Sequence, residues 1–151
     1  MNKNPQVYRK QRSGALHLTQ KVDYALMLLI CLAKDAKKES VSIKQIAEER
    51  TLSFSFLQKI AGALCRANII EAERGKYGGY KLKKDPSKIK LLEIIEILEG
   101  PISIVPCLKD CFDGPPCDKK NLNCEVKHGL KKINKDIESF FAKKTLKEII
   151  S

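Results

Sequence analysis

Four cysteines, at positions 107, 111, 117 and 124, fall within eighteen residues of the chain. Thiols at this density hold a metal ion or an iron–sulfur cluster, or they pair as disulfides. The first two are close enough for a zinc knuckle, but the second knuckle of a structural zinc site is missing. The C-x2-C-x2-C run of bacterial-type ferredoxins is missing as well. We therefore favour an iron–sulfur cluster held by a loop, with zinc as the alternative.

The remainder of the chain argues against disulfides. Residues 1–13 are polar and basic and lack the apolar core of a secretory signal. The longest apolar run, residues 24–33, is too short to span a bilayer. We therefore expect a cytoplasmic protein with no membrane partner, in which thiols stay reduced. Cys31 and Cys65 lie inside apolar helical patterns and are expected to act as small buried hydrophobes.

The charge balance points to a polyanionic partner. Lysine and arginine number 29 against 18 aspartates and glutamates, a formal net charge of +11. Such an excess favours nucleic acid or an anionic membrane, and a merely solvated surface is the alternative. The sequence shows no nucleophile–base pair and no phosphate-binding loop, so we do not expect an enzyme.

The spacing of apolar residues predicts a helix over 19–33, a second from 42, and a third over 54–67. Strands are predicted at 69–72 and 80–82, around a glycine-rich tip at 75–79. This is the order of a winged helix-turn-helix. Thr19 is expected to cap the first helix, Ser42 to form a capping box with Gln45, and Asn68 to adopt a left-handed conformation.

The predicted fold class is mainly α, a winged helix-turn-helix with a two-stranded wing, a cysteine loop and a long C-terminal dimerisation helix. The parts are a basic flexible tail (1–15), the winged helix-turn-helix (16–84), a linking helix (85–100), the cysteine-rich cluster loop (101–123), and the dimerisation helix with a C-terminal turn (124–151).

The last helix carries an apolar stripe of Val126, Leu130, Ile133, Ile137, Phe140 and Phe141. We interpret this stripe as a dimer seam. Packing against the helix around 91–98 is the alternative, and both can hold.

The third helix is the expected recognition helix, with its N-terminal residues in the major groove of DNA. Its candidate contacts are Ser53, Ser55, Gln58 and Lys59, and those of the wing are Arg74, Gly75, Lys76 and Tyr77. Glutamine can pair with adenine, and lysine can reach guanine or phosphate. An arginine beside glycines suits a minor groove. The alternatives are a solvated helix face and a purely structural hairpin.

Four motifs resemble one known family. They are Leu18-Thr19-x3-Asp23-Tyr24-Ala25-Leu26, Leu52-Ser53-x2-Phe56-Leu57-x-Lys59-Ile60-x2-Ala63-Leu64-x2-Ala67-Asn68, Arg74-Gly75-x2-Gly78-Gly79-Tyr80-x-Leu82, and Thr145-Leu146-x-Glu148-Ile149. With the cysteine loop between them, residues 16–150 resemble the Rrf-two family of bacterial winged-helix transcription regulators. The combination is specific, although each motif alone would be weak.

The resemblance implies a homodimer that binds pseudo-palindromic double-stranded promoter DNA. In cluster-binding members three cysteines hold a [2Fe-2S] or [4Fe-4S] cluster, and these match Cys111, Cys117 and Cys124. Asp23 matches an aspartate ligand that some members supply from the first helix of the other subunit. We rank it first as the fourth ligand, then Cys107, then His128.

Departures from the family pattern leave the cluster type and the signal open. One branch of the family has a histidine ligand three residues after the last cysteine, where this chain has Lys127; His128 is one position later. The spacing before Cys124 is also one residue longer than in that branch.

The sequence thus predicts a transcription regulator whose promoter binding is controlled by an iron–sulfur cluster that senses redox state, nitric oxide or cluster supply. The alternatives are a zinc- or thiol-switched regulator of the same fold, or an iron–sulfur carrier or assembly factor. The helix-turn-helix and wing argue against a carrier. Repression and activation both remain open.

Overall fold

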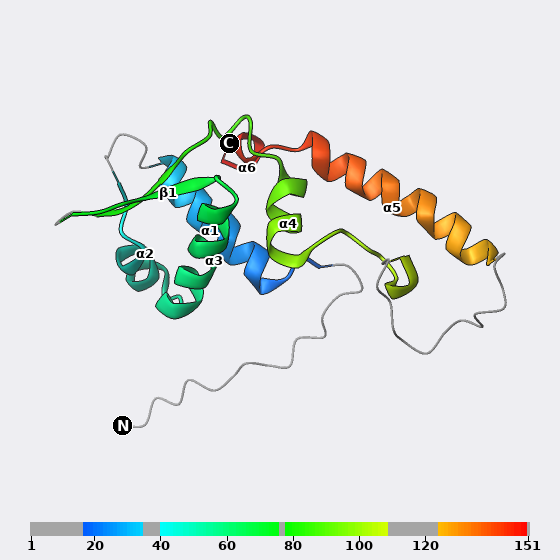
Figure 1. Cartoon of the computed structure of the whole chain (residues 1–151), viewed down its shortest axis with the longest axis horizontal. Helices are drawn as coiled ribbons and strands as arrows, with labels where there is room; N and C mark the ends of the chain where they lie inside the picture. The colour runs from blue at the N-terminus through cyan, green and yellow to red at the C-terminus, as the bar shows by residue number, and fades with distance from the viewer. Residues whose placement is uncertain (1–16, 35–39, 76–77, 109–123, 151) are drawn as a thin grey trace, which may run out of the picture.

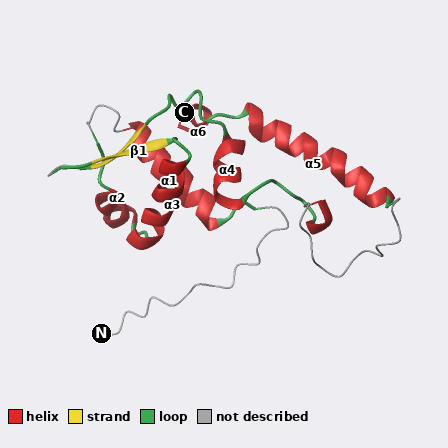
Figure 2. Ribbon diagram, in the orientation of Figure 1, coloured by secondary structure: helices red, strands yellow, loops and turns green. Residues whose placement is uncertain are grey.

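The computed structural model describes residues 17–34, 40–75, 78–108 and 124–150. The expected tail, Lys76, Tyr77, Cys111 and Cys117 lie outside these ranges. Figures 1 and 2 show the elements, which are α1 (Gln20–Lys34), α2 (Ile43–Arg50), α3 (Phe54–Arg66), β1 (Ile70–Glu73), β2 (Gly79–Leu82), α4 (Leu91–Glu99), the 3-10 turn η1 (Pro106–Leu108), α5 (Glu125–Lys143) and α6 (Leu146–Ile150). The prediction of a mainly helical winged helix-turn-helix with a two-stranded wing is confirmed.

The core lies where α1, α3 and α4 meet, with α2 and the wing packed against it. Helix α3 shows why the sequence folds this way, since its Leu57, Ile60, Ala61 and Leu64 are buried at helical spacing. Cys31 and Cys65 are half-buried and pack against this core, where burial raises the pKa of the Cys65 thiol.

Two of the three expected helix-end features are confirmed. The Val22 N–H donates to the Thr19 hydroxyl oxygen at 3.3 Å, and Asn68 has a φ of 57°. The capping box at Ser42 was wrong, because the Ser42 side chain makes no cap hydrogen bond. The Gln45 amide donates instead to the Glu49 carboxylate at 2.7 Å, one turn further along α2.

The wing is a short antiparallel hairpin tied to the start of the helix-turn-helix. Ile70 lies opposite Leu82, one residue later than the predicted strand start, because the Ile69 N–H bonds back to α3. Val41 and Tyr80 exchange two backbone hydrogen bonds of 3.0 and 2.8 Å. This isolated bridge fixes the base of the wing relative to the segment that precedes α2.

Gly79 is required by this bridge. A Cβ added at Gly79 would lie 2.4 Å from the Val41 carbonyl oxygen, so either the wing or the segment that precedes α2 must move. We expect Gly79→Ala to cost about 1–3 kcal/mol of unfolding free energy, measured by chemical denaturation. The control is Gly129→Ala in α5, where nothing lies within 4 Å of the new Cβ. That change should stabilise the protein, by up to about 1 kcal/mol. Equal stability of the Gly79 variant and the wild type would contradict the close approach.

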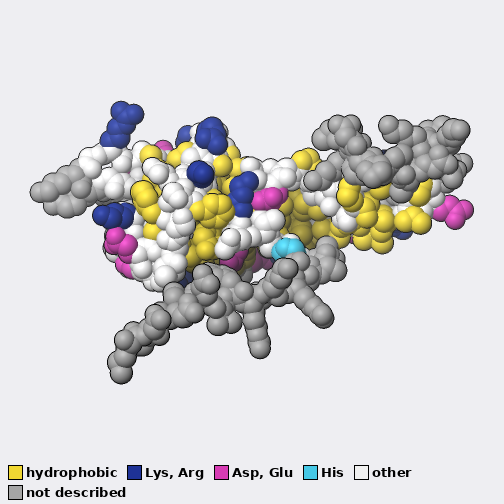
Figure 3. Space-filling model, turned by 90° about the horizontal axis from the view of Figure 1, so that it is seen from below, with side chains coloured by type: hydrophobic (Ala, Val, Ile, Leu, Met, Phe, Trp, Pro, Cys, Tyr) yellow, Lys and Arg dark blue, Asp and Glu magenta, His cyan; other side chains and the backbone are white. Residues whose placement is uncertain are grey.

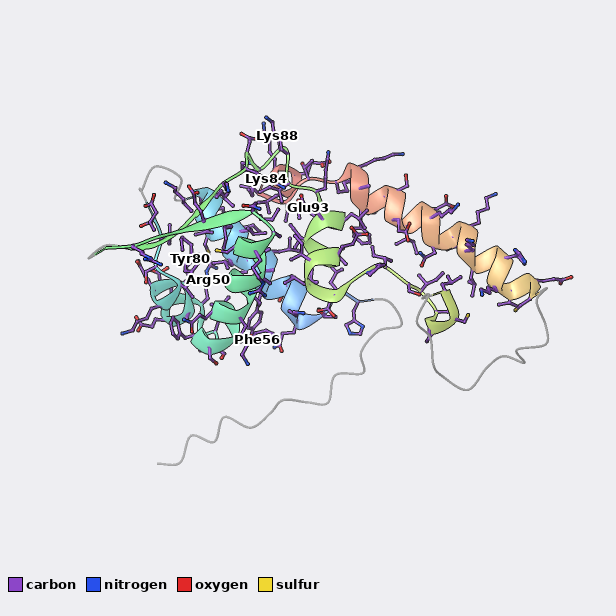
Figure 4. The ribbon with its side chains drawn as sticks, in the orientation of Figure 1. Arg50, Phe56, Tyr80, Lys84, Lys88 and Glu93 are labelled. Atoms are coloured by element: carbon purple, nitrogen blue, oxygen red, sulfur yellow. The ribbon has the colours of Figure 1, made fainter. Side chains whose placement is uncertain are left out.

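The predicted linking helix over 85–100 needs a correction, because α4 begins at Leu91. The Asp85 carboxylate accepts from the Ser87 backbone N–H at 2.8 Å and also from the Ser87 hydroxyl. These bonds form a side-chain turn that competes with helix formation, and they lower the pKa of Asp85. Lys84 and Glu93 point toward each other across this connection at 2.6 Å (Figure 4).

Helix α5 extends from the body as a long arm that packs against α4 at its C-terminal half and leads into α6 (Figure 1). The chain after α5 returns to the body, since the Leu146 N–H donates to the Ile89 carbonyl at 2.9 Å and Leu146 is fully buried. Packing of the last long helix against α4, which the sequence left as one of two possibilities, is thus observed. The C-terminal turn belongs to the core of the winged helix.

Candidate DNA interface and cysteine segment

The N-terminal half of α3 presents a polar face to solvent. All four predicted contact residues at this end are exposed: Ser53, which is the N-cap, and Ser55, Gln58 and Lys59 of the helix itself. The Ser53 hydroxyl oxygen caps the helix by accepting from the Phe56 N–H at 3.4 Å, and it lies 3.2 Å from the Ser55 hydroxyl. The structure therefore brings the predicted helix residues together on one accessible surface.

An aromatic pair holds the start of α3 against α1. The rings of Tyr24 and Phe56 meet edge to face, with centroids 5.4 Å apart at 72°. Figure 4 labels Phe56 at this end of the helix-turn-helix. Because α1 and α2 both pack on α3, the exposed face is carried by a rigid base.

The described part of the wing tip carries Arg74 and Gly75, both exposed. Gly75 has a φ of 138°, a conformation that side-chain-bearing residues rarely adopt. In the strands of the wing, Lys81 of β2 forms ion pairs with two glutamates of β1, with Glu71 at 3.4 Å and with Glu73. The hydrogen bond to Glu73 raises the pKa of Lys81, so this lysine stays charged but is engaged within the wing. Arg74 has no ion pair among the described residues.

The two ends of the cysteine segment both attach to α5. Cys107 lies half-buried in η1, which packs against α5. Cys124 is the N-cap of α5, and its sulfur accepts from the Lys127 N–H at 3.4 Å. Within the described residues no group of three potential metal ligands is formed, and Cys111 and Cys117 lie outside them.

Asn134 anchors the chain that leads into the cysteine segment. Its side chain, only 7% exposed, accepts from the Ile104 N–H and donates to the Ile102 carbonyl, both at 3.0 Å, and donates to Glu138 at 2.7 Å. Asn134 is not among the site residues that the sequence predicts. Its signal was a single asparagine on the same side of the helix as Leu130 and Phe141.

The candidates for the fourth ligand come from three elements. His128 is exposed one turn into α5. Its backbone N–H donates to the Cys124 carbonyl at 3.0 Å, so His128 lies one helical turn from the last cysteine. Asp23 is exposed in the first turn of α1. The start of α1 borders a cavity of about 370 Å³, which Val22 lines together with Ile137 and Phe141 of α5. The structure does not gather Asp23, Cys107 and His128 into one cluster.

A helix-turn-helix with an exposed recognition helix and a basic wing tip defines a winged-helix DNA-binding protein. The family model Rrf2, described as an iron-dependent transcriptional regulator, matches residues 18–151. The chain therefore belongs to the Rrf2 family, as its motifs indicated.

Individual relatives agree with this assignment. The transcriptional regulator NsrR of Bacillus subtilis is 33% identical over 140 residues, which cover 89% of this chain and 90% of that protein. Among solved structures, CymR, the global cysteine regulator of B. subtilis, has a TM-score of 0.71 at 29% identity and covers 89% of this chain and 96% of CymR. IscR of T. potens has a TM-score of 0.68 at 29% identity, with 89% and 86% covered.

These relatives are transcription regulators and not enzymes, so the predicted class of protein, a DNA-binding transcription regulator, is confirmed. Helices in the described ranges are too short or too polar to cross a membrane.

Proposed function

We propose that this Rrf2-family regulator is a cytoplasmic homodimer whose promoter affinity is controlled by an iron–sulfur cluster at Cys111, Cys117 and Cys124. The observation that carries the proposal is the position of Cys124. It caps α5, and α5 packs on α4 beside the DNA-binding core. A ligand held at this sulfur would therefore be joined directly to the helix that links the cysteine segment to the DNA-binding body.

The chemistry of the donor set fits such a cluster. Thiolates are soft ligands that suit iron–sulfur centres. The start of α5 adds the partial positive charge of a helix N-terminus, which favours a negatively charged thiolate group. A bound cluster would supply reactivity toward oxidants, nitric oxide or iron–sulfur shortage. On the protein side, Cys124 holds the start of α5 and Asn134 holds the entry to the segment.

The DNA-binding role uses the exposed face at the start of α3 and the tip of the wing. The face of Ser53, Ser55, Gln58 and Lys59 enters the major groove, and the wing residues Arg74, Gly75, Lys76 and Tyr77 approach the neighbouring backbone or minor groove. Two copies joined along α5 would present two such surfaces to the half-sites of a promoter.

A thiol-switched or zinc-bound regulator is the second candidate. Cys107 and Cys124 are free, partly accessible thiols at the two ends of the segment, and the structural relative CymR is a cysteine regulator. Anaerobic purification separates the candidates. A cluster-bound regulator should show visible absorbance with matching iron and sulfide contents. A colourless protein with zinc or no metal would support the thiol-switched or zinc-bound regulator.

Alanine variants of Asp23, Cys107 and His128, reconstituted anaerobically, test the fourth ligand. We expect Asp23→Ala to shift the visible spectrum and to speed cluster loss, because one iron would lose the carboxylate oxygen that completes its ligand set. Cys31→Ala is the control, since this thiol packs on the core away from the segment. An unchanged spectrum, cluster lifetime and nitric oxide response in Asp23→Ala would instead place all the ligands within the loop. Asp23 would then be a first-turn charge favoured by the helix dipole.

A further inference from the structure

Phe54 is a large apolar side chain that stays 46% exposed at the start of the recognition helix. It is the first residue of α3, directly after the Ser53 cap. One side of the ring borders a shallow groove along α2, lined by Ala47, Thr51 and Leu52. The rest of the ring faces solvent. Within the described residues of α2, α3 and the wing, no other large hydrophobic side chain is as exposed as Phe54.

Phe54 differs from the other phenylalanine of this helix. Phe56, two residues later, turns inward and packs edge to face on Tyr24. The sequence therefore places one phenylalanine to anchor the helix and leaves a second directed outward. The side of the Phe54 ring that borders the α2 groove packs against the protein, while its exposed side remains accessible to a partner.

The position of Phe54 indicates which partner it meets. Residues four apart lie next to each other on a helix surface, so Phe54 is one turn ahead of the exposed Gln58. The N-terminal residues of a recognition helix contact base edges in the major groove. There the hydrogen-bonding groups of the bases meet polar side chains, and the apolar feature is the C5-methyl group of thymine.

We propose that Phe54 is a specificity-determining residue that contacts a thymine methyl group in each operator half-site. The inference rests on the proposed function, because it requires α3 to enter the major groove. Phe54 and Gln58 then form a pair of readers suited to A·T base pairs. Glutamine bonds the adenine edge, and the ring covers the methyl group of a thymine in the same or the neighbouring pair.

The test removes the methyl group from the DNA and the ring from the protein. A duplex of roughly 30 base pairs, enough for two half-sites, is selected by the wild-type protein from a random pool. Each thymine is then replaced in turn by deoxyuridine, which lacks only the methyl group. Binding of wild type, Phe54→Ala and Gln58→Ala is measured by fluorescence anisotropy. Phe54→Gln, which keeps the length without the ring, replaces Phe54→Ala if the alanine variant does not fold.

We expect one thymine per half-site at which deoxyuridine weakens wild-type binding by about three- to fivefold, the value of one buried methyl group. Phe54→Ala should bind the two duplexes equally, while Gln58→Ala should keep the sensitivity to the methyl group. The inference is overturned if wild type is insensitive at every thymine, or if wild type and Phe54→Ala lose affinity equally. In both cases specific binding persists and the proposed function stands. A wild-type protein that selects no sequence over an unrelated duplex overturns both.

Discussion

The double variant Ile133→Asp/Ile137→Asp should be a monomer that no longer binds promoter DNA specifically. Ile133 is 50% exposed and Phe140 57% exposed, and both border an apolar depression on α5 together with Ile137 and Phe141. Figure 3 shows hydrophobic side chains gathered along this helix. If a second copy covers the stripe, each aspartate becomes a buried, unpaired charge that costs several times the ~1 kcal/mol of an ordinary contact.

Loss of DNA binding follows from geometry. Two half-sites about one helical turn apart are read only when two recognition helices are held at that spacing. A monomer keeps one recognition helix and one wing, so it should retain weak, non-specific binding.

Sedimentation velocity measures the oligomeric state, and circular dichroism checks that the variant is folded. The matched control is Lys135→Gln/Ser139→Asp, which makes the same change of −2 in charge on the opposite side of α5, where both residues are exposed. Ile137 also lines the cavity beside α1, so the single variant Ile133→Asp separates the dimer seam from intrachain packing. A folded double variant that sediments as a dimer would refute the seam.

The regular parts of the fold could be predicted because local spacing decides them. In α3 the residues at helical spacing are the buried ones, so the exposed side, with its DNA-reading candidates, followed from the same pattern. The left-handed Asn68 could be anticipated because few residues tolerate that conformation.

The errors came from competition between side chains and the backbone. Asp85 looked like a helix start, but its carboxylate bonds Ser87 in a turn that delays α4 to Leu91. Ser42 and Gln45 matched the capping pattern, yet Gln45 found Glu49 as a partner. Short-range motifs cannot tell which of two nearby partners a polar side chain will choose.

Long-range polar contacts were out of reach of the sequence. Asn134 bonds backbone groups about thirty residues earlier, and Thr19 donates to Glu99 at 2.9 Å across eighty positions. Such pairs have no periodicity, and a loop offers no register from which to infer them. The ligand set at Cys111 and Cys117 stays a prediction, because these residues lie outside the described ranges.

DNA affinity should fall steeply with salt. The chain carries 29 basic against 18 acidic residues, and Arg74 projects from the described part of the wing without an ion pair there. Each phosphate that a cationic side chain neutralises releases condensed counterions, so salt opposes binding. With about six to ten phosphate contacts in the dimer, affinity should drop roughly 10³- to 10⁵-fold between about 50 and 200 mM salt.

Arg74→Ala locates part of this effect in the wing. If the guanidinium contacts phosphate, the variant should bind all duplexes more weakly, and its slope of log affinity against log salt should be shallower by about one per subunit. Lys131→Ala is the control, because it removes the same charge from an exposed position on α5. Anisotropy titrations at four or more salt concentrations, on the selected duplex and on an unrelated one, give both slopes.

Salt-independent binding, or equal slopes for Arg74→Ala and Lys131→Ala, would show that the wing does not supply the electrostatic contact. A slope that stays unchanged while A·T preference relaxes would instead place Arg74 in the minor groove, where it reads groove width through the enhanced negative potential of A·T-rich DNA.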